Sequence, residues 1–284
     1  MAQLIDGSRI AKDLQDQLAQ TILAHTNLGR RRPFLTVVLV GEDPASQIYV
    51  RHKEKACHSV GIDSETIHKP ASISEQDLVA LITQLNADPS VDGILVQLPL
   101  PKHIHSFNVI SAINPSKDVD GLHPYNQGLL AMNKARHVPC TPSGIMKLLE
   151  AIDFKFEGKI AAVIGRSILV GSPVARLLLH RNTTVIHIHS KTPSPWALAR
   201  QADLLVVAVG SAKLIDAKWV REGAVVIDVG IHRIDDKLCG DVDFDAVKDQ
   251  ASWITPVPKG VGPMTIACLL LNCFNAYVAS FDKV

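Results

Sequence analysis

Short apolar runs rich in β-branched residues alternate with amphipathic helical stretches along this chain, and that alternation is what most restricts its fold. FLTVVLVG (34–41) and VDGILVQLPLP (91–101) have the composition of buried strands. We expect helices over 8–25 and 74–88, capped by Ser8 and Ser74, and a helix between them that opens at Asp43-Pro44 or Ser46. Strand–helix–strand alternation predicts a parallel sheet covered on both faces.

A second alternating series follows residue 140. KDVDGLHPYNQGLL (117–130) has weak periodicity and predicts an ordered loop between two domains. A helix is expected to follow, with Thr141 as its cap and Pro142 in its first turn. Strands are expected at 159–165, 183–190, 202–210 and 223–230, with a helix over PVARLLLH. A long last helix from Met264 should pack back across the first domain. The prediction is an α/β protein of two domains with a cleft between them: 1–140 plus 264–284, and a Rossmann-like parallel-sheet domain over 141–263.

Composition excludes several classes of partner. The 284 residues carry a formal net charge of +1 with both signs interspersed, which gives no case for nucleic acid or an anionic membrane surface. The N-terminus lacks an apolar signal core, and apolar runs such as IACLLL are too short to span a bilayer. Five scattered cysteines without CxxC spacing suggest reduced thiols in the cytoplasm. His187 and His189 share a strand face but have no further ligand at metal spacing, so we expect no metal.

The stretch IGRSILVGSP places a glycine turn between a strand and a helix N-terminus, where backbone N–H groups can bind an anion. Its spacing is not G-x-G-x-x-G, so a tight turn without a ligand remains an alternative. The next strand ends in His189-Ser190-Lys191, with no carboxylate to accept from a ribose 2′-hydroxyl. A 2′-phosphate would instead suit Ser190 with Arg166 or Lys191. This pattern favours NADP over NAD.

Tyr49 and Lys53 lie four residues apart on a predicted helix, so their side chains share one face. An ordinary surface helix is the alternative. Short-chain dehydrogenases also carry a Tyr-x-x-x-Lys pair, but well after their glycine loop, whereas here the pair precedes it. The order favours a first domain with the reactive pair and a second domain with the nucleotide.

Other polar residues follow strands or lie in glycine-rich loops. Gln97 stands at a strand end, where open α/β sheets bind ligands, and Asp120 precedes a turn glycine. Their neighbours Lys117 and Asp118 are expected to face solvent. ITPVPKGVGPMT (254–265) predicts a rigid loop that leads into the last helix.

Taken together, these segments resemble the bifunctional methylenetetrahydrofolate dehydrogenase/methenyltetrahydrofolate cyclohydrolase family. The resemblance is carried by SQIYVRHKEKAC, GILVQLPLP, KDVDGLHP, GRSILVGSP, VVIDVGI and ITPVPKGVGPMT, in the family's order and over nearly the whole chain. It implies NADP-dependent oxidation of 5,10-methylenetetrahydrofolate, hydrolysis of the product to 10-formyltetrahydrofolate, and a homodimer that pairs through the nucleotide domains.

The resemblance also implies roles for single residues. Lys53 would be the catalytic lysine, Gln97 would hydrogen-bond it, Tyr49 would stack on the folate ring and Asp120 would hold the pterin edge, with Pro263 also at the substrate. The implied cofactor-binding residues are Gly165, Arg166, Ser167, Ser190 and Ile231. Two positions depart from the family pattern: Lys259, where glycine is usual and where a positive φ would strain lysine, and Ile168, where a polar residue is common.

Charge restricts the mechanism that the resemblance implies. Oxidation leaves a cationic methenyl bridge, and an ammonium group about 4 Å away would raise its energy by roughly 4 kcal/mol at an effective dielectric near 20. Lys53 is therefore expected to be neutral or compensated at that stage, and then to accept a proton from the attacking water. The alternatives are a two-domain NADP dehydrogenase of the amino-acid or shikimate kind and a folate- or nucleotide-binding protein without turnover.

Overall fold

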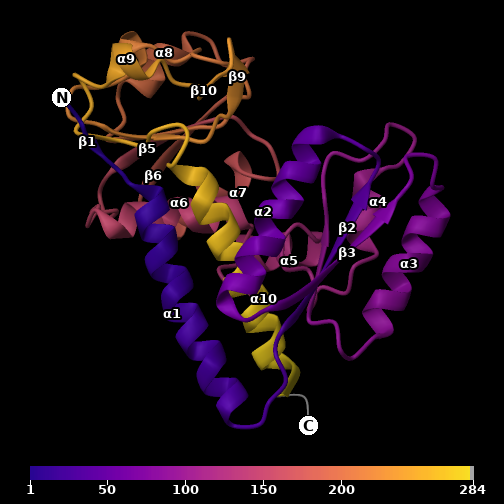
Figure 1. Cartoon of the computed structure of the whole chain (residues 1–284). Helices are drawn as coiled ribbons and strands as arrows, with labels where there is room; N and C mark the ends of the chain where they lie inside the picture. The colour runs from indigo at the N-terminus through magenta and orange to yellow at the C-terminus, as the bar shows by residue number, and fades with distance from the viewer. Residues whose placement is uncertain (282–284) are drawn as a thin grey trace. The chain divides into compact units, whose positions relative to one another are not determined.

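The computed structural model describes residues 1–281 and consists of two compact α/β units (Figure 1). We call them the six-stranded unit, Met1–Lys12 with Pro139–Thr265, and the three-stranded unit, Asp13–Val138 with the chain from Ile266 onward. The predicted α/β class is confirmed. Met1–Lys12 were grouped with the other unit in the sequence prediction, but strand β1 (Gln3–Leu4) pairs in parallel with β11 (Trp253–Ile254).

The three-stranded unit contains a parallel sheet of strand order β3-β2-β4. Its strands and shorter helices are β2 (Phe34–Val40), α2 (Pro44–Val60), β3 (Asp63–Lys69), α3 (Glu75–Ala87), β4 (Gly93–Val96), α4 (Ser106–Ser111) and α5 (Pro124–Ala131). Val38 and Val40 pack with Leu78 and Ile82 of α3 in one apolar cluster. Figure 1 shows α2 on the other side of the sheet, so both faces are covered as predicted.

Strand β3 and helix α5 were not predicted. The β3 sequence DSETIHK is polar at most positions and mainly half-exposed, so it lacks the apolar run that marks β2 and β4. Helix α5 lies within the segment predicted to be a loop, and it begins at Pro124 behind His123, whose Nδ1 accepts the N–H of Tyr125 at 3.0 Å.

Two long helices, α1 (Gly7–Asn27) and α10 (Val261–Phe281), each begin in the six-stranded unit and continue into the three-stranded unit. In the latter they pack together, since the rings of His25 and Phe274 lie 5.3 Å apart. By length and composition alone α10 could cross a membrane, but 56% of its apolar window is buried within the structure. Packing therefore accounts for its hydrophobicity.

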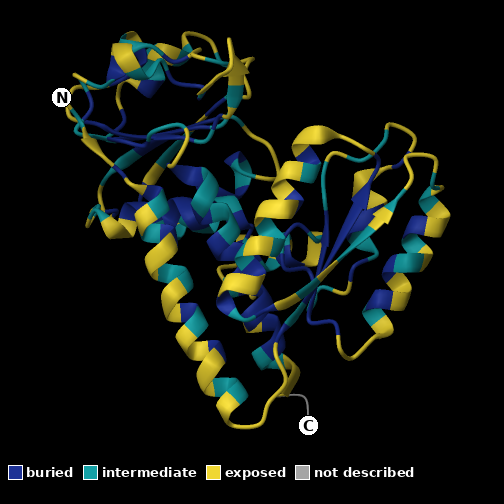
Figure 2. Ribbon diagram, viewed as in Figure 1, coloured by how far each residue is buried: buried dark blue, intermediate teal, exposed yellow. Residues whose placement is uncertain are grey.

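The six-stranded unit contains a fully parallel sheet of order β1-β11-β8-β7-β5-β6, beside a small antiparallel hairpin. Figure 1 shows this sheet between a layer with α6 and α7 and a layer with α8 and α9. Its central strands β5, β7 and β8 are almost entirely buried, as the dark blue ribbons in Figure 2 show, whereas the edge strands β1 and β6 are largely exposed or half-buried. The remaining elements are α6 (Cys140–Ala151), β5 (Ile160–Ile164), α7 (Gly171–His180), β6 (Thr184–Ile188), α8 (Pro195–Ala199), β7 (Leu204–Val207), η1 (Ala217–Trp219), β8 (Val225–Asp228), β9 (His232–Ile234), β10 (Lys237–Cys239) and α9 (Phe244–Val247).

Two residues that were predicted as helix caps, Ser8 and Thr141, lie within their helices instead. The cap of α1 is Asp6, whose Oδ1 accepts the N–H of Arg9 at 3.0 Å, and Ser8 already lies within the helix. Thr141 is likewise inside α6, and its hydroxyl pairs with that of Thr265 at 2.9 Å. Ser74 is confirmed as the cap of α3, since its Oγ accepts the N–H of Asp77.

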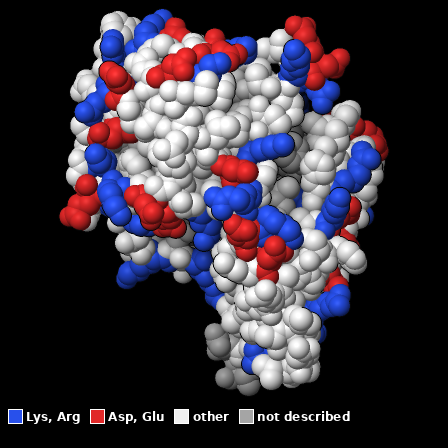
Figure 3. Space-filling model, turned by 60° about the vertical axis from the view of Figure 1, so that its left-hand side comes forward, with Lys and Arg blue, Asp and Glu red and all other residues white. Residues whose placement is uncertain are grey.

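Charged side chains of both signs are intermingled on the face shown in Figure 3, in keeping with the net charge of +1. All five cysteines are free thiols, and four of them are buried.

His137 should make the protein sensitive to mild acid. Its side chain is fully buried, and burial lowers its pKa from 6.5 to about 4. Between pH 4 and pH 6.5 the folded state therefore binds fewer protons than the unfolded state. The unfolding free energy is unaffected by His137 above pH 6.5 and decreases as the pH falls from 6.5 toward 4. We expect about 3 kcal/mol of unfolding free energy to be lost across this window.

His137→Gln should flatten that part of the pH–stability curve, because its amide can still donate to the carbonyl of Ser116 as Nε2 does at 3.2 Å. Chemical denaturation at several pH values measures this, with the exposed His58→Gln as control. An equally steep loss in both variants would contradict the assignment.

Lys259 has φ of +83°, so the strain expected for lysine at this position is present. A left-handed backbone conformation lowers the unfolding free energy by roughly 1–2 kcal/mol when the residue is not glycine. Glycine avoids this strain, but the greater conformational entropy of its unfolded state lowers the unfolding free energy by about 0.5–1 kcal/mol. Lys259→Gly should therefore raise the unfolding free energy by about 0.5–1 kcal/mol. The control is Lys155→Gly, in an exposed loop without positive φ, which should lower stability. A loss of stability in both variants would show that position 259 is not strained.

Candidate active site

Helix α2 presents Tyr49 and Lys53 on one face, as the four-residue spacing predicts. The helix is fixed at both ends: the Asp43 carboxylate accepts the N–H of Ser46 at 2.7 Å, and Gly61 ends it with φ of 85°. Tyr49 is 39% exposed, and partial burial raises the pKa of its hydroxyl. Lys53 is half-buried. An aromatic ring and an amine therefore lie one turn apart at the edge of this unit's core.

The amine of Lys53 donates to Oε1 of Gln97 at 2.9 Å. Gln97 directly follows β4, and its backbone N–H extends the ladder to the carbonyl of Val38 at 2.9 Å. Its side-chain Nε2 donates to the carbonyl of Leu98 at 2.7 Å, which directs the oxygen of the amide toward Lys53. The structure thus brings together the lysine and the glutamine that the sequence placed 44 positions apart.

Cys57, one turn beyond Lys53, is the nearest potential nucleophile on the same helix face. Its thiol is fully buried, and burial raises its pKa to about 12. Because the thiolate is the reactive form, this cysteine is inert at neutral pH. The reactive group on this face is the amine.

Asp120 lies half-buried in a turn that its neighbour Asp118 organises. Asp118 is 1% exposed, and its carboxylate accepts the backbone N–H groups of Leu122 (3.2 Å) and His123 (2.8 Å) and the amide of Asn126 (2.7 Å). Burial raises the pKa of Asp118, whereas these donors act in the opposite direction. The prediction that Asp118 faces solvent is wrong, because its carboxylate supplies the acceptors that close the turn.

Two further side chains hold the same turn. Lys117, also predicted to face solvent, is half-buried and donates to two backbone carbonyls at the carboxyl end of α3, at 3.0 and 2.6 Å. Asn272 of α10 donates from Nδ2 to the carbonyls of Val119 and Val138, both at 2.9 Å. The sequence carried one signal for Asn272 that we did not use, a polar residue within the apolar run LLLNCF.

The glycine turn in the six-stranded unit has the shape of a nucleotide cradle. Gly165 follows β5 with φ of 110°, and a Cβ there would lie 2.0 Å from the carbonyl oxygen of Ala208. A Cβ on Gly171, the first residue of α7, would lie 2.1 Å from the oxygen of Gly165. Arg166 and Ser167 between them are exposed. The backbone approaches this closely only because both positions are glycine, and the positive N-terminal end of α7 suits a phosphate.

Ser190 lies at the same edge of the sheet as the turn, because β5 and β6 are parallel and Ile164 is opposite Ile188. It is exposed, and its neighbours are His189 and Lys191. His187 contacts the turn itself, with Nε2 2.8 Å from the carbonyl oxygen of Gly165. The residues present therefore fit a dinucleotide with a 2′-phosphate better than one with a free 2′-hydroxyl.

Ile231 and Pro263 lie at the other end of this sheet edge. Ile231 follows the loop after β8 and is 45% exposed, and its Cδ1 would be 3.7 Å from a Cβ on Gly262. Pro263 is half-buried in the first turn of α10. Lys259 is exposed, and its carbonyl accepts the N–H of Ser8 at 3.0 Å.

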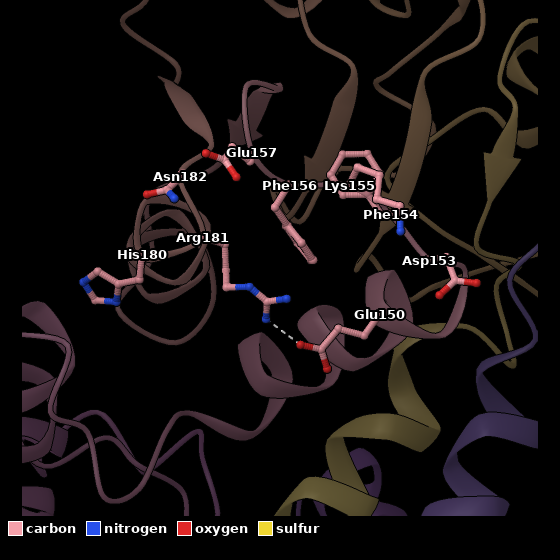
Figure 4. A pocket seen from close by; sticks show the side chains of 9 residues that line it. All are labelled: Glu150, Asp153, Phe154, Lys155, Phe156, Glu157, His180, Arg181 and Asn182. Carbon is pink, nitrogen blue, oxygen red and sulfur yellow. Dashed lines mark hydrogen bonds and ion pairs between the residues drawn. The ribbon is translucent and has the colours of Figure 1, made fainter.

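A separate surface cavity is not part of this constellation (Figure 4). It is lined by residues at the ends of α6 and α7 and before β5, where Arg181 pairs with Glu150 at 2.6 Å and stacks over Phe156 at 4.4 Å. These residues precede β5 or follow α7, so they lie at the amino edge of the sheet. Among the described residues, no three His, Cys, Asp or Glu side chains converge as metal ligands.

Comparison with known proteins identifies the family. Residues 5–120 match the model for the tetrahydrofolate dehydrogenase/cyclohydrolase catalytic domain, and residues 139–281 match that family's NAD(P)-binding domain. The bifunctional protein FolD of Geobacillus thermodenitrificans is 52% identical over 276 residues, covering 97% of each chain.

Solved structures agree with these matches. The bifunctional FolD methylenetetrahydrofolate dehydrogenase/cyclohydrolase of Campylobacter jejuni is 44% identical, with a TM-score of 0.96 and all of both chains covered. The Trypanosoma brucei enzyme, complexed with NADP and an inhibitor, is 37% identical with a TM-score of 0.94, covering 99% of this chain and 98% of that one. The chain belongs to the tetrahydrofolate dehydrogenase/cyclohydrolase family.

Proposed function

We infer that this protein is a bifunctional folate enzyme that oxidises 5,10-methylenetetrahydrofolate to 5,10-methenyltetrahydrofolate with NADP and hydrolyses that product to 10-formyltetrahydrofolate. The observation that carries this inference is the 2.9 Å hydrogen bond from Lys53 to Gln97, one turn from Tyr49, in a chain whose two halves both match the family. An ordinary surface helix would not need a hydrogen bond that orients a lysine amine beside an aromatic ring, so this pairing supports a catalytic role.

Gln97 suits a lysine that must work without its charge. A carboxylate at this position would favour the ammonium form of Lys53, whereas a neutral amide orients the amine without that bias. An uncharged amine does not oppose formation of the cationic methenyl bridge, and it can accept a proton as water attacks the methenyl carbon. Lys53 is thus assigned as the general base of hydrolysis, positioned by Gln97.

The remaining substrate contacts are assigned by the same proposal. Tyr49 offers an exposed ring face on which the folate bicycle can stack. Asp120 offers a carboxylate to the amino-pyrimidine edge of the pterin, from the turn that Asp118 holds. Pro263 is assigned to the substrate as well, from the first turn of α10.

We assign the cofactor to the carboxyl edge of the six-stranded sheet. Bound NADP supplies the hydride acceptor. Gly165, Arg166 and Ser167 are assigned to the dinucleotide, with Ser190 and Arg166 at its 2′-phosphate and Ile231 at the nicotinamide. The close backbone approach at the two glycines supports this assignment.

We also propose that the three-stranded unit is the folate-binding catalytic domain and the six-stranded unit the NADP domain. A homodimer that pairs through the NADP domains and a cytoplasmic location complete the proposal. Four buried free thiols among five support a reducing compartment.

Replacing the lysine should separate the two activities. In Lys53→Met, the turnover number for methenyltetrahydrofolate hydrolysis should fall at least 100-fold, the range that general acid–base catalysis supplies. Dehydrogenase turnover should fall less, by about tenfold, because hydride transfer needs only alignment from this residue. NADPH absorbance and the acid-revealed methenyl chromophore measure the two steps.

Lys55→Met is the matched control, since Lys55 is exposed two positions along the same helix and should leave both rates within twofold of wild type. Unchanged hydrolysis in Lys53→Met would reject the assignment of Lys53. Absence of both activities in the wild-type protein would favour a binding protein without turnover.

Arg166→Ala should weaken NADP selectively. Loss of a guanidinium beside a 2′-phosphate should raise the KM for NADP at least tenfold, whereas the KM for NAD should change less than twofold. Steady-state dehydrogenase kinetics with each dinucleotide measure this. Arg221→Ala is the control, because Arg221 pairs with Asp203 at 2.9 Å at the opposite edge of the sheet. Equal effects on NADP and NAD would count against a 2′-phosphate contact.

A further inference from the structure

Two buried carboxylates lie at the carboxyl edge of the six-stranded sheet, in positions that the proposed reaction does not use. Asp228 is the last residue of β8 and is 4% exposed, and Asp241 follows β10 and is fully buried. Together they accept six backbone N–H groups. Burying two carboxylates is unfavourable unless every oxygen is paired, so this arrangement requires an explanation.

Asp241 holds the loop after β7. Its Oδ2 accepts the N–H groups of Val209 (2.7 Å) and Gly210 (3.1 Å), and its Oδ1 accepts the N–H of Ser211 at 2.9 Å. Nε2 of His232, in the first strand of the hairpin, lies 2.8 Å from the same Oδ1. One carboxylate therefore ties the end of β7 to the hairpin that follows β8.

Asp228 holds the other side of the same junction. Its Oδ1 accepts the N–H groups of Gly230 (3.0 Å) and Asp241 (2.9 Å), and its Oδ2 accepts the N–H of Val242 at 3.0 Å. Its own backbone N–H donates to Oγ1 of Thr255 at 2.7 Å. We call Asp228 and Asp241 with these donors the carboxylate clasp.

Each carboxylate fills the space that a glycine leaves open. A Cβ on Gly240 would lie 1.8 Å from Oδ2 of Asp228, and a Cβ on Gly230 would lie 2.5 Å from Cγ of Asp241. Both glycines thus admit the opposite aspartate. This reciprocal fit allows no other side chain at positions 230 and 240 without moving the clasp.

The clasp contacts the segments that adjoin the assigned cofactor residues. Val209 follows Ala208, whose carbonyl oxygen lies where a Cβ of Gly165 would be, and Gly230 precedes Ile231. The clasp therefore connects Val209, which adjoins the glycine turn through Ala208, with Gly230, which adjoins Ile231, the residue assigned to the nicotinamide. Thr255 extends it to the loop that leads into α10.

We propose that Asp241, braced by Asp228, is a positioning residue for NADP, which aligns the loops after β7 and β8 for the nicotinamide half of the dinucleotide. This inference rests on the proposed function. Burial raises the pKa of Asp228 to about 6, and the charge of Asp241 adds to that shift against the three N–H donors. A buried carboxylate with a raised pKa, held by a second buried carboxylate beside the assigned cofactor residues, is a candidate for a functional role.

Asp241→Asn tests the proposal with little change of shape. An amide has one acceptor oxygen, so it must set its NH₂ group against either the Val209 and Gly210 donors or the Ser211 donor. We expect the dissociation constant of NADPH, measured by fluorescence titration, and the KM for NADP to rise about tenfold. The KM for methylenetetrahydrofolate and the kcat/KM for methenyltetrahydrofolate hydrolysis should stay within twofold, because the catalytic pair Lys53 and Gln97 and the stacking ring of Tyr49 lie in the other unit.

Asp243→Asn is the matched control, because it makes the same charge change two residues away at the start of α9, where the aspartate side chain makes no capping hydrogen bond. Should Asp241→Asn fail to fold, His232→Leu removes one contact to Oδ1 and leaves every backbone donor in place. It should raise the NADPH dissociation constant about threefold.

An unchanged NADPH dissociation constant in the folded Asp241→Asn variant, or in His232→Leu if that variant has to be used, would overturn the proposal. So would a parallel loss of hydrolysis, which would show that the clasp only stabilises the fold. These outcomes are separate from failure of the proposed function, in which the wild-type protein would lack both activities.

Discussion

The hydrogen bond between the Lys53 amine and the Gln97 amide joins a helix to the end of a parallel strand, and the proposed chemistry depends on it. Gln97 can take part because its backbone continues the ladder of β2 while its Nε2 is already bound to the carbonyl of Leu98. The carbonyl oxygen that remains is oriented and uncharged. A neutral amide at this position orients the lysine without favouring its ammonium form.

Buried polar side chains hold the loops around this pair and around the glycine turn. Asp118 and Asn272 bind the backbone on either side of Asp120, and Asp228 and Asp241 bind the loops after β7 and β8. Parallel sheets leave their loops at the carboxyl edge without ladder partners, so those N–H and C=O groups need side-chain partners. Both units use aspartate as the acceptor for loop N–H groups, and in the three-stranded unit asparagine also donates to loop carbonyls.

Local strain is also present near the proposed cofactor edge. Lys259 adopts φ of +83° in the loop before α10, and its carbonyl nonetheless accepts the N–H of Ser8. A Cβ on Gly7 would lie 1.9 Å from the oxygen of Gly260, so the start of α1 and this loop approach each other closely. Tight backbone packing therefore holds a conformation that lysine alone would avoid.

The sequence by itself determined the α/β class and the positions of the long helices and apolar strands. Periodicity and β-branched runs report burial directly, which is why β2, β4, β5 and β7 were predicted and the polar strand β3 was not. Tertiary structure alone decided that Asp118 is buried, that β1 joins the sheet of the other unit and that Asp241 reaches the loop after β7. These features depend on partners about 30 or more positions away, or on which side of a turn faces inward, and no local pattern encodes either.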